Sequence, residues 1–291
     1  MSLPGRKLKE FVIEKLVLIC GLASIFFVLL IFAFLLKEGV SVFKGVSPGN
    51  FLFGKSWYPI SEPAQLGILP LILGSLLVTL GAAVISIPIG VGCAVYIAEV
   101  APQRAKDALK AGIELLAAIP SVVLGFIGMV TLVPWVKQVF HLPTGLTALS
   151  GSIMLAFMAM PTIVSIAEDA LYSVPKSYKE GALALGATPW QAIRRVMLPA
   201  ASSGILAAVM LGLGRVIGET MAVMMITGNS AVMPQSILQP VRTLTATIAA
   251  EMGEAVVGSE HYFALFAIGI VLFVISFAVN ASADIFLHKK Q

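Results

Sequence analysis

The chain has 291 residues, of which 58% are hydrophobic and 12% are charged, and its mean hydropathy is +0.98. A soluble domain cannot bury that much apolar surface, so the composition excludes one and predicts an integral membrane protein. The formal net charge of +4 is too small and too dispersed to favour nucleic-acid binding.

Apolar stretches of membrane-spanning length recur along the chain. A helix needs about 20 apolar residues to cross a hydrocarbon core of about 30 Å. The sequence therefore predicts an all-α membrane protein, with six transmembrane helices in a single domain over residues 1–291. The expected spans are residues 16–36, 68–98, 113–136, 149–167, 200–227 and 263–287, with an inner loop at 168–199 and an outer loop at 228–262.

The first two stretches have features of their own. Basic residues precede Leu16–Leu36, as in a signal peptide, but the stretch is longer than a cleavable core and no small-residue cleavage site follows it. We therefore expect a retained first span. The second stretch contains Pro70 and Pro88, which predict that part of it tilts or kinks.

The distribution of basic residues predicts the orientation of the spans. With an inner N-terminus, thirteen Lys and Arg residues fall on inner segments, five on outer segments and one, Arg215, within the fifth span. Cytoplasmic loops retain positive charge, so both termini are expected in the cytoplasm. The inner set is Arg6, Lys7, Lys9, Lys15, Arg104, Lys106, Lys110, Lys176, Lys179, Arg194, Arg195, Lys289 and Lys290; the outer set is Lys37, Lys44, Lys55, Lys137 and Arg242.

The first outer loop contains GNFLFGKS, residues 49–56, which matches the phosphate-binding P-loop pattern. A working P-loop joins a buried strand to a helix whose free amides face the phosphates. Here Phe-Leu-Phe occupies the interior, Pro59 and Pro63 oppose a helix after Ser56, and the loop lies on the side without ATP. We therefore predict an ordinary outer loop and no catalytic residue.

The inner loop 168–199 is more than a connector. Ser177 and Glu180 have the spacing of a capping box at the start of a helix. Gly186 can end that helix in a left-handed conformation, Thr188 can cap the next helix, and Pro189 suits its first turn. The sequence predicts two short helices that meet at a glycine corner and form a compact knob on the inner face.

Part of this loop resembles the EAA signature of ABC importer permeases. The resemblance implies that the knob is a coupling helix, which sits in a groove of a cytoplasmic ATPase. Gly181 stands where the signature prefers alanine, and an ordinary amphipathic hairpin is the alternative interpretation. The matching residues are Glu180, Gly181, Ala182, Gly186, Leu198 and Pro199.

The fifth stretch carries Arg215 near its middle and Glu219 four residues later. An arginine at the centre of a span costs at least about 2.5 kcal/mol on insertion scales, so it is expected to face a partner or water. On a continuous helix the two side chains share a face and lie within ion-pair reach. Because a guanidinium offers forked donors to phosphate oxygens, we predict that Arg215 contacts an anion in transit and Glu219 positions it. A purely structural salt bridge is the alternative.

Longer strings narrow the resemblance to the PstC family, the permease subunits of phosphate ABC importers, over essentially the whole chain. They are ELLAAIPSVVLGFIG (114–128), GLGRVIGETMAVMMITGN (212–229) and PVRTLTATIAAEMGEA (240–255). The resemblance implies a type I ABC importer permease fold in a bacterial or archaeal cell membrane, with ATP and Mg²⁺ bound on a separate ATPase. The implied partners are a PstA-like permease in a heterodimer, two PstB-like ATPase subunits and a PstS-like phosphate-binding protein.

Other functions stay open from the residues alone. A PstA-type sister permease or a permease for another oxyanion would share the knob and a charged span. A proton-coupled secondary anion transporter is a rival of a different class, because an intramembrane Glu219 suits proton coupling.

The outer segment 227–262 has apolar residues, including Leu244 and Ile248, that predict a short amphipathic helix. This helix is expected to expose Glu251 and Glu254, either as a contact for the phosphate-binding protein or as ordinary solvated surface. Arg242 is a weaker candidate for meeting an anion. The cysteines and histidines have no metal-ligand spacing, so no metal site is expected.

Overall fold

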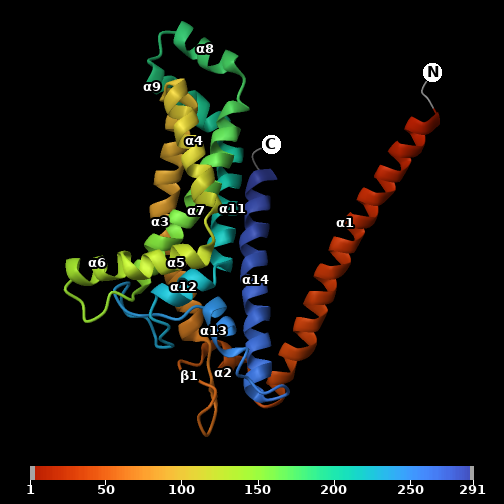
Figure 1. Cartoon of the computed structure of the whole chain (residues 1–291), viewed down its shortest axis with the longest axis vertical. Helices are drawn as coiled ribbons and strands as arrows, with labels where there is room; N and C mark the ends of the chain where they lie inside the picture. The colour runs from red at the N-terminus through yellow and green to blue at the C-terminus, as the bar shows by residue number, and fades with distance from the viewer. Residues whose placement is uncertain (1–3, 289–291) are drawn as a thin grey trace.

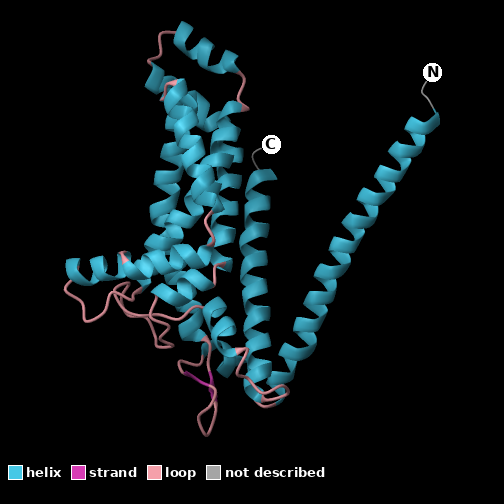
Figure 2. Cartoon of the chain, viewed as in Figure 1, coloured by secondary structure: helices cyan, strands magenta, loops and turns pink. Residues whose placement is uncertain are grey.

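The computed structural model describes residues 4–288, and side chains for residues 10–282. Long helices run side by side in an elongated bundle with short helices at both ends (Figure 1). Within the described chain, the regular structure that is not helical is one short antiparallel hairpin of β1 (Trp57–Tyr58) and β2 (Gln65–Leu66) (Figure 2).

Five described helical segments are long and apolar enough to cross a membrane: Glu10–Lys44, Leu69–Val100, Ser121–Val139, Ala148–Tyr172 and Glu260–Ser282. A helix pair bent by 70°, Pro189–Ala200 with Ser202–Gly218, makes a sixth if it counts as one span. The helical elements in chain order are α1 (Pro4–Gly39), the 3-10 turn η1 (Val40–Lys44), α2 (Pro48–Phe53), α3 (Leu69–Val95), the π-helical turn η2 (Tyr96–Val100), α4 (Gln103–Ala118), α5 (Ser121–Val130), α6 (Leu132–Val139), α7 (Ala148–Tyr172), α8 (Lys176–Ala184), α9 (Pro189–Ala192), the π-helical turn η3 (Ile193–Met197), α10 (Leu198–Ala200), α11 (Ser202–Gly218), α12 (Met221–Ile226), α13 (Leu244–Glu251) and α14 (Glu260–His288).

Helix α7 is the centre of the bundle, where it packs against α3 and α11. In its most apolar stretch 61% of the residues are buried, a larger share than in the other long apolar helices described. Gly90 of α3 and Gly212 of α11 both lie against Ile163 of α7, and a Cβ at either glycine would come within 2.9 and 2.5 Å of that side chain. The glycines therefore let three helix backbones approach closely, as is common in membrane bundles.

Helix α1 lies apart from the bundle, and its C-terminal part meets the N-terminal part of α14 (Figure 1). The contact is aromatic, with ring centroids 4.7 Å apart for Phe32 and Phe273 and 5.4 Å apart for Phe34 and Phe266. The most apolar stretch of α1 has no buried residue. Such a surface requires lipid or another subunit around it.

The third expected span, residues 113–136, is not one helix. Helix α4 ends at Ala118, Ile119 is extended with ψ of 127°, and α5 begins after Pro120. Proline disfavours helical backbone in the residue before it, which explains the break. Helix α4 runs along the bundle, whereas α5 and α6 run across it (Figure 1).

The fifth expected span, residues 200–227, is also broken. Helix α11 ends at Gly218, and Glu219 has an extended backbone with φ of −70° and ψ of 132°. Helix α12 starts two residues later, where the Glu219 carboxylate accepts the N–H of Ala222 at 3.3 Å. The carboxylate thus satisfies a free amide in the first turn of α12, which favours a second helix over a continuous one.

The P-loop-like segment is a structural element at the end of the molecule opposite α8 and α9. Ser47 caps α2, and Phe51 of that helix is fully buried against the ring of Phe43. A strand follows Ser56 in place of the helix that a P-loop requires. The prediction that no helix follows Ser56 is confirmed, but residues 49–53 lie in α2, so the segment is not an ordinary loop.

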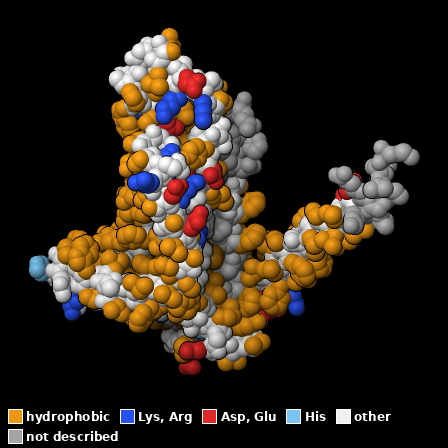
Figure 3. All heavy atoms as spheres, turned by 45° about the horizontal axis from the view of Figure 1, so that its top comes forward, with side chains coloured by type: hydrophobic (Ala, Val, Ile, Leu, Met, Phe, Trp, Pro, Cys, Tyr) orange, Lys and Arg blue, Asp and Glu red, His pale blue; other side chains and the backbone are white. Residues whose placement is uncertain are grey.

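The two ends of the bundle differ in character. We call the segment Lys176–Ala192, which holds α8 and α9, the knob. The start of α1 and the end of α14 both point toward the knob end (Figure 1). Charged side chains gather on that half of the face seen in Figure 3, while the half away from the knob is mostly hydrophobic.

Candidate functional site

The knob has the corner that its sequence predicts. Gly186 has φ of +85°, and the N–H groups of Gly186 and Ala187 donate to the carbonyls of Leu183 and Ala182 at 3.0 and 3.1 Å. This pattern is a Schellman motif, in which glycine adopts the left-handed conformation at low cost. Thr188 then caps α9 in a capping box with Gln191.

The start of α8 differs from the prediction. Helix α8 begins at Lys176 after Pro175, and the side chain of Ser177 makes no capping bond. Proline at the boundary sets the entry into the helix with its fixed φ, so the expected capping box of Ser177 with Glu180 is wrong.

The knob presents its signature residues to solvent. Glu180 and Gly181 are exposed, and a Cβ added to Gly181 would have no neighbour within 4 Å. Leu185 and Trp190 beside them are 91% and 61% exposed. Large apolar side chains clustered on a polar segment are typical of a docking surface.

Leu198 and Pro199 lie in α10, at the base of the knob rather than on its surface. Leu198 is partly buried against an apolar cluster formed by the ends of α3 and α7 and by η3. The cluster includes the buried Ile193 and Met197 of η3. The structure therefore exposes Glu180, Gly181 and Pro199, whereas Leu198 and its apolar cluster form an anchoring group that holds the knob on the bundle.

Sequence reasoning missed a polar network at the knob end. Glu99 of η2 forms an ion pair with Lys179 of α8. Lys106 of α4 donates to the carbonyl of Ala98 at 3.0 Å and to the Tyr172 hydroxyl at 3.1 Å. An acidic residue at the inner end of the second apolar stretch was the available signal, but nothing in the sequence indicates its partner.

A second ion pair joins α4 to α7 near the same end. Lys110 Nζ lies 3.1 Å from the carboxylate of Glu168, whose side chain is 3% exposed. The hydrogen bond with Glu168 raises the pKa of Lys110 above its ordinary value, while partial desolvation opposes this shift. The lysine therefore stays charged and compensates a buried carboxylate.

Arg215 and Glu219 do not form the expected ion pair. Because the helix ends at Gly218, Glu219 leaves the face that Arg215 occupies, and no ion pair joins them in the described structure. Arg215 is exposed and has no described side-chain partner, whereas Glu219 is partly buried and bonded to Ala222. The arginine thus presents an uncompensated positive charge on the surface of α11, which suits an anion.

Helix α13 is joined to the break at Glu219. Thr243 caps α13, Thr245 Oγ1 donates to the Glu219 carbonyl at 2.9 Å, and the N–H of Leu244 donates to Ser75 of α3 at 2.9 Å. The start of α13 is therefore bonded to α3 and to the backbone of Glu219, four residues after Arg215. The predicted short helix exists, with Leu244 fully buried.

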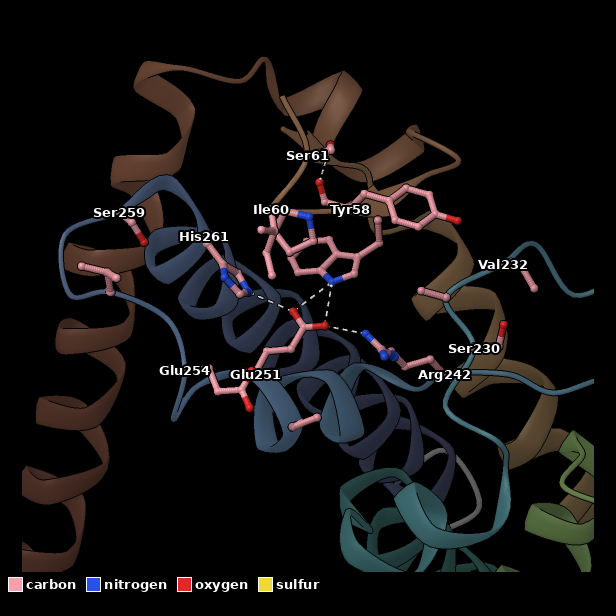
Figure 4. Close-up of a pocket in the computed structure, with 15 residues that line it drawn as sticks. Tyr58, Ile60, Ser61, Ser230, Val232, Arg242, Glu251, Glu254, Ser259 and His261 are labelled. Carbon is pink, nitrogen blue, oxygen red and sulfur yellow. Dashed lines mark hydrogen bonds and ion pairs between the residues drawn. The ribbon is translucent and has the colours of Figure 1, made fainter. Parts of the chain in front are cut away.

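The other end of α13 carries the carboxylate of Glu251, on which three side chains converge (Figure 4). The indole N–H of Trp57 lies 3.0 Å from it, Nε2 of His261 lies 2.9 Å from it, and Arg242 forms an ion pair with it. Arg242 also donates to the carbonyl of Asn229 at 3.0 Å. These side chains line a cavity of about 930 Å³ at the end away from the knob.

The expected exposure of the outer acidic residues is half right. Glu254 is exposed, but the side chain of Glu251 is only 17% exposed because its partners surround it. Arg242 is 19% exposed and its charge is already paired, which leaves it little capacity for a free anion. Sequence reasoning missed Trp57, which is 194 positions from Glu251 in the chain, and His261, which follows Glu251 by 10 positions at the start of α14.

Sequence comparison places the chain among transport proteins. Residues 86–290 match the family of binding-protein-dependent transport system inner membrane components. The chain is 43% identical over 278 residues to the probable ABC transporter permease protein YqgH of Bacillus subtilis, covering 95% of this chain and 90% of that one. It is 36% identical over 259 residues to the phosphate transport system permease protein PstC of Mesorhizobium japonicum, covering 82% and 78%. It is 37% identical over 242 residues to PstC 1 of Mycobacterium tuberculosis, covering 76% and 72%.

Solved structures of ABC transporters share the fold. A bacterial ABC transporter involved in the import of the acidic polysaccharide alginate superposes with a TM-score of 0.66 at 16% identity, covering 98% of this chain and 99% of that one. The MetNI methionine ABC transporter in an inward-facing conformation superposes with a TM-score of 0.62 at 20% identity, covering 80% and 100%. At these identities the likeness concerns the fold alone.

Proposed function

Because the chain belongs to the binding-protein-dependent transport system inner membrane component family, we propose that this ABC importer permease carries inorganic phosphate. It has the type I importer permease fold and acts in the inner membrane with an ATPase and a substrate-binding protein, as its family requires. Membership of this family also removes the proton-coupled alternative. The observation that supports phosphate as cargo is the series of PstC relatives, which match at 32–37% identity over most of the chain.

We propose the specific partners that the resemblance to PstC implies. The chain forms half of the translocation pathway in a heterodimer with a PstA-like permease. Two PstB-like ATPase subunits bind ATP and Mg²⁺ beneath the pair, and a PstS-like protein delivers phosphate from the other side. Both termini and the knob then lie in the cytoplasm, in agreement with the excess of basic residues on these segments.

The knob is the coupling element in this proposal. Its exposed Glu180, Gly181 and Leu185 enter a groove of the ATPase, and the anchoring group around Leu198 transfers the motion to the bundle. Closure of the ATPase pair rocks the spans between inward-open and outward-open arrangements. The chain itself supplies no catalytic residue, because hydrolysis takes place on its partner.

Arg215 is the substrate-contacting residue of this half. Its guanidinium offers forked donors to phosphate oxygens, and its exposed position on α11 leaves those donors free. Glu219 positions it indirectly, by ending α11 directly after the arginine's turn and by starting α12. The carbonyl of Glu219 also accepts a hydrogen bond from Thr245 of α13. Helix α13 is therefore attached to the chain segment that follows Arg215.

The experiment that tests this function is reconstitution of the four-component system in proteoliposomes. Phosphate uptake is expected to require ATP and the loaded binding protein, to persist when the proton gradient is collapsed, and to exceed sulfate uptake by at least about tenfold. Equal or preferred sulfate uptake would assign another oxyanion to the permease. Uptake without the ATPase would contradict the proposal as a whole.

A further inference from the structure

Helix α8 packs against η3 and forms one ion pair with the end of α3. The helix contributes no buried residue of its own. Among the residues that the structure describes, the bond from Lys179 to Glu99 is the only side-chain hydrogen bond or ion pair from α8 to the transmembrane bundle. The Lys179 side chain is 33% exposed, while its neighbours Lys176 and Glu180 are exposed.

Glu99 occupies a π-helical turn at the end of α3. The N–H of Ala101 donates to the carbonyl of Tyr96 at 2.8 Å, so the turn is wider than the α-helix it extends. The Glu99 side chain is only 9% exposed. A carboxylate so nearly buried requires a compensating cation, which makes Lys179 costly to withdraw.

The same turn is fixed to two further helices. Lys106 of α4 bonds to the carbonyl of Ala98, next to Glu99, and to the hydroxyl of Tyr172 at the end of α7. The Lys106 ammonium also lies 5.4 Å from the centroid of the Tyr172 ring, within cation–π range. The π-helical turn is therefore a junction at which α3, α4, α7 and α8 meet through polar contacts.

We propose that Lys179 and Glu99 are positioning residues that transmit displacement of the knob to α3. The inference rests on the proposed function, in which the ATPase moves the knob. The exposed face of α8 docks on the ATPase, and Lys179 faces the bundle. Displacement of α8 therefore reaches α3 through the ion pair of Lys179 with Glu99. Helix α3 packs against α7 and against α11, which carries Arg215. Displacement of Glu99 at the end of α3 therefore also moves α7 and α11.

The knob has a second attachment besides the ion pair of Lys179 with Glu99, namely the anchoring group at its base. Leu198 packs against an apolar cluster that includes Val95 of α3 and Ala201 at the entry to α11. The ion pair instead connects the first knob helix with the second long apolar helix, 80 positions earlier in the chain. The knob therefore meets the end of α3 through two kinds of contact, an apolar one at α10 and a charged one at α8.

The test measures phosphate molecules moved per ATP hydrolysed in the reconstituted four-component complex. Lys179→Met and Glu99→Gln are each expected to retain the ATPase on purification but to lower this ratio about tenfold, because knob movement no longer reaches α3. The reversed pair, Lys179→Glu with Glu99→Lys, is expected to restore the ratio to within about threefold, as double-mutant logic requires. Lys176→Met on the same helix is the matched control and should leave the ratio unchanged.

Three results would overturn the inference. One is a wild-type transport ratio in Lys179→Met, and another is a reversed pair no better than the single variants. The third is loss of the co-purifying ATPase in Lys179→Met, which would mean that the pair serves assembly rather than transmission. Failure of the proposed function is distinguishable, because the wild-type complex would then take up no phosphate with ATP.

Discussion

The indole N–H of Trp57 lies 3.0 Å from the carboxylate of Glu251, which is 194 positions later in the chain. The same carboxylate receives Arg242 and His261, so one acidic side chain joins β1, the segment before α13, α13 itself and the start of α14. The cap of the bundle at the end away from the knob is therefore organised around a single charge.

Glu251→Gln is expected to destabilise this cap. The amide can still accept from Trp57, but it leaves the partly buried Arg242 without its counter-charge, at a cost of about 1–3 kcal/mol. Thermal unfolding in detergent should show a lower Tm for this variant. Glu254→Gln is the matched control, because Glu254 is exposed and lines the same cavity. Equal Tm values for the two variants would show that the convergence on Glu251 contributes no stability.

Arg215→Gln is expected to abolish most phosphate transport without preventing assembly. Arg215 is exposed on α11 and makes no described bond that holds the fold, so its loss removes substrate contact alone. Uptake should fall at least about tenfold, since a charge-assisted bond to a transported oxyanion is removed. Arg215→Lys should retain part of the activity, because it keeps the charge but loses the fork.

The control for this prediction is Arg104→Gln, which removes an exposed arginine at the knob end. Hydrolysis by the associated ATPase should continue in both variants. Normal uptake by Arg215→Gln would mean that the arginine does not contact the cargo.

Substitution of two knob glycines by alanine should have opposite effects. Gly186 has φ of +85°, so Gly186→Ala is expected to cost about 1–2 kcal/mol in knob stability although no atom lies within 4 Å. Gly181 lies within α8 and also has no neighbour within 4 Å, so Gly181→Ala should stabilise that helix by about 0.5–1 kcal/mol. Amide hydrogen exchange over residues 176–192 should accelerate in the first variant and slow in the second. The same direction of change in both would contradict the left-handed corner.

Close packing around α7 predicts a difference between two glycines of α3. A Cβ at Gly90 would lie 2.9 Å from Ile163, so Gly90→Ala is expected to destabilise the bundle by about 1–3 kcal/mol through overpacking. Gly92 has no neighbour within 4 Å, so Gly92→Ala should be neutral or slightly stabilising. Thermal unfolding of the two variants in one detergent measures the contrast. Similar Tm values would show that α3 and α7 can separate at this point without cost.

The ion pair of Lys110 with Glu168 has a predictable dependence on pH. The pKa of Lys110 is raised above its ordinary value of 10.5 by its bond to Glu168. A raised pKa means that the stabilisation is complete below pH 10.5 and is lost as the pH rises through the folded-state pKa. The Tm difference between wild type and Lys110→Met should therefore be constant between about pH 6 and 9 and shrink only in stronger alkali. A decline of this difference near neutral pH would argue against a charged lysine in the pair.

Local features of the structure could be predicted from the sequence because they depend on neighbouring residues. Gly186 ends α8 in the left-handed region, and Thr188 with Pro189 starts α9, since backbone conformation and capping act over a few positions. The prediction failed at the start of α8, where Pro175 decides the boundary instead of Ser177.

The apolar stretches predicted a membrane protein, but they did not show where the helices break. A hydropathy pattern stays continuous through Pro120 and Glu219, although Pro120 precedes the start of α5 and Glu219 follows the end of α11. The break at Glu219 separates it from Arg215, so the ion pair expected from four-residue spacing does not form. Spacing predicts a shared face only where the helix continues.

The sequence by itself determined the membrane class, the apolar helices and the knob with its corner, because hydropathy and local backbone preferences are properties of short segments. The tertiary structure alone decided which charges meet: Glu251 with Arg242 and His261, and Glu99 with Lys179. These partners are 9, 10 and 80 positions apart in the chain. They lie on different segments, and only the packing of those segments brings their side chains within bonding distance.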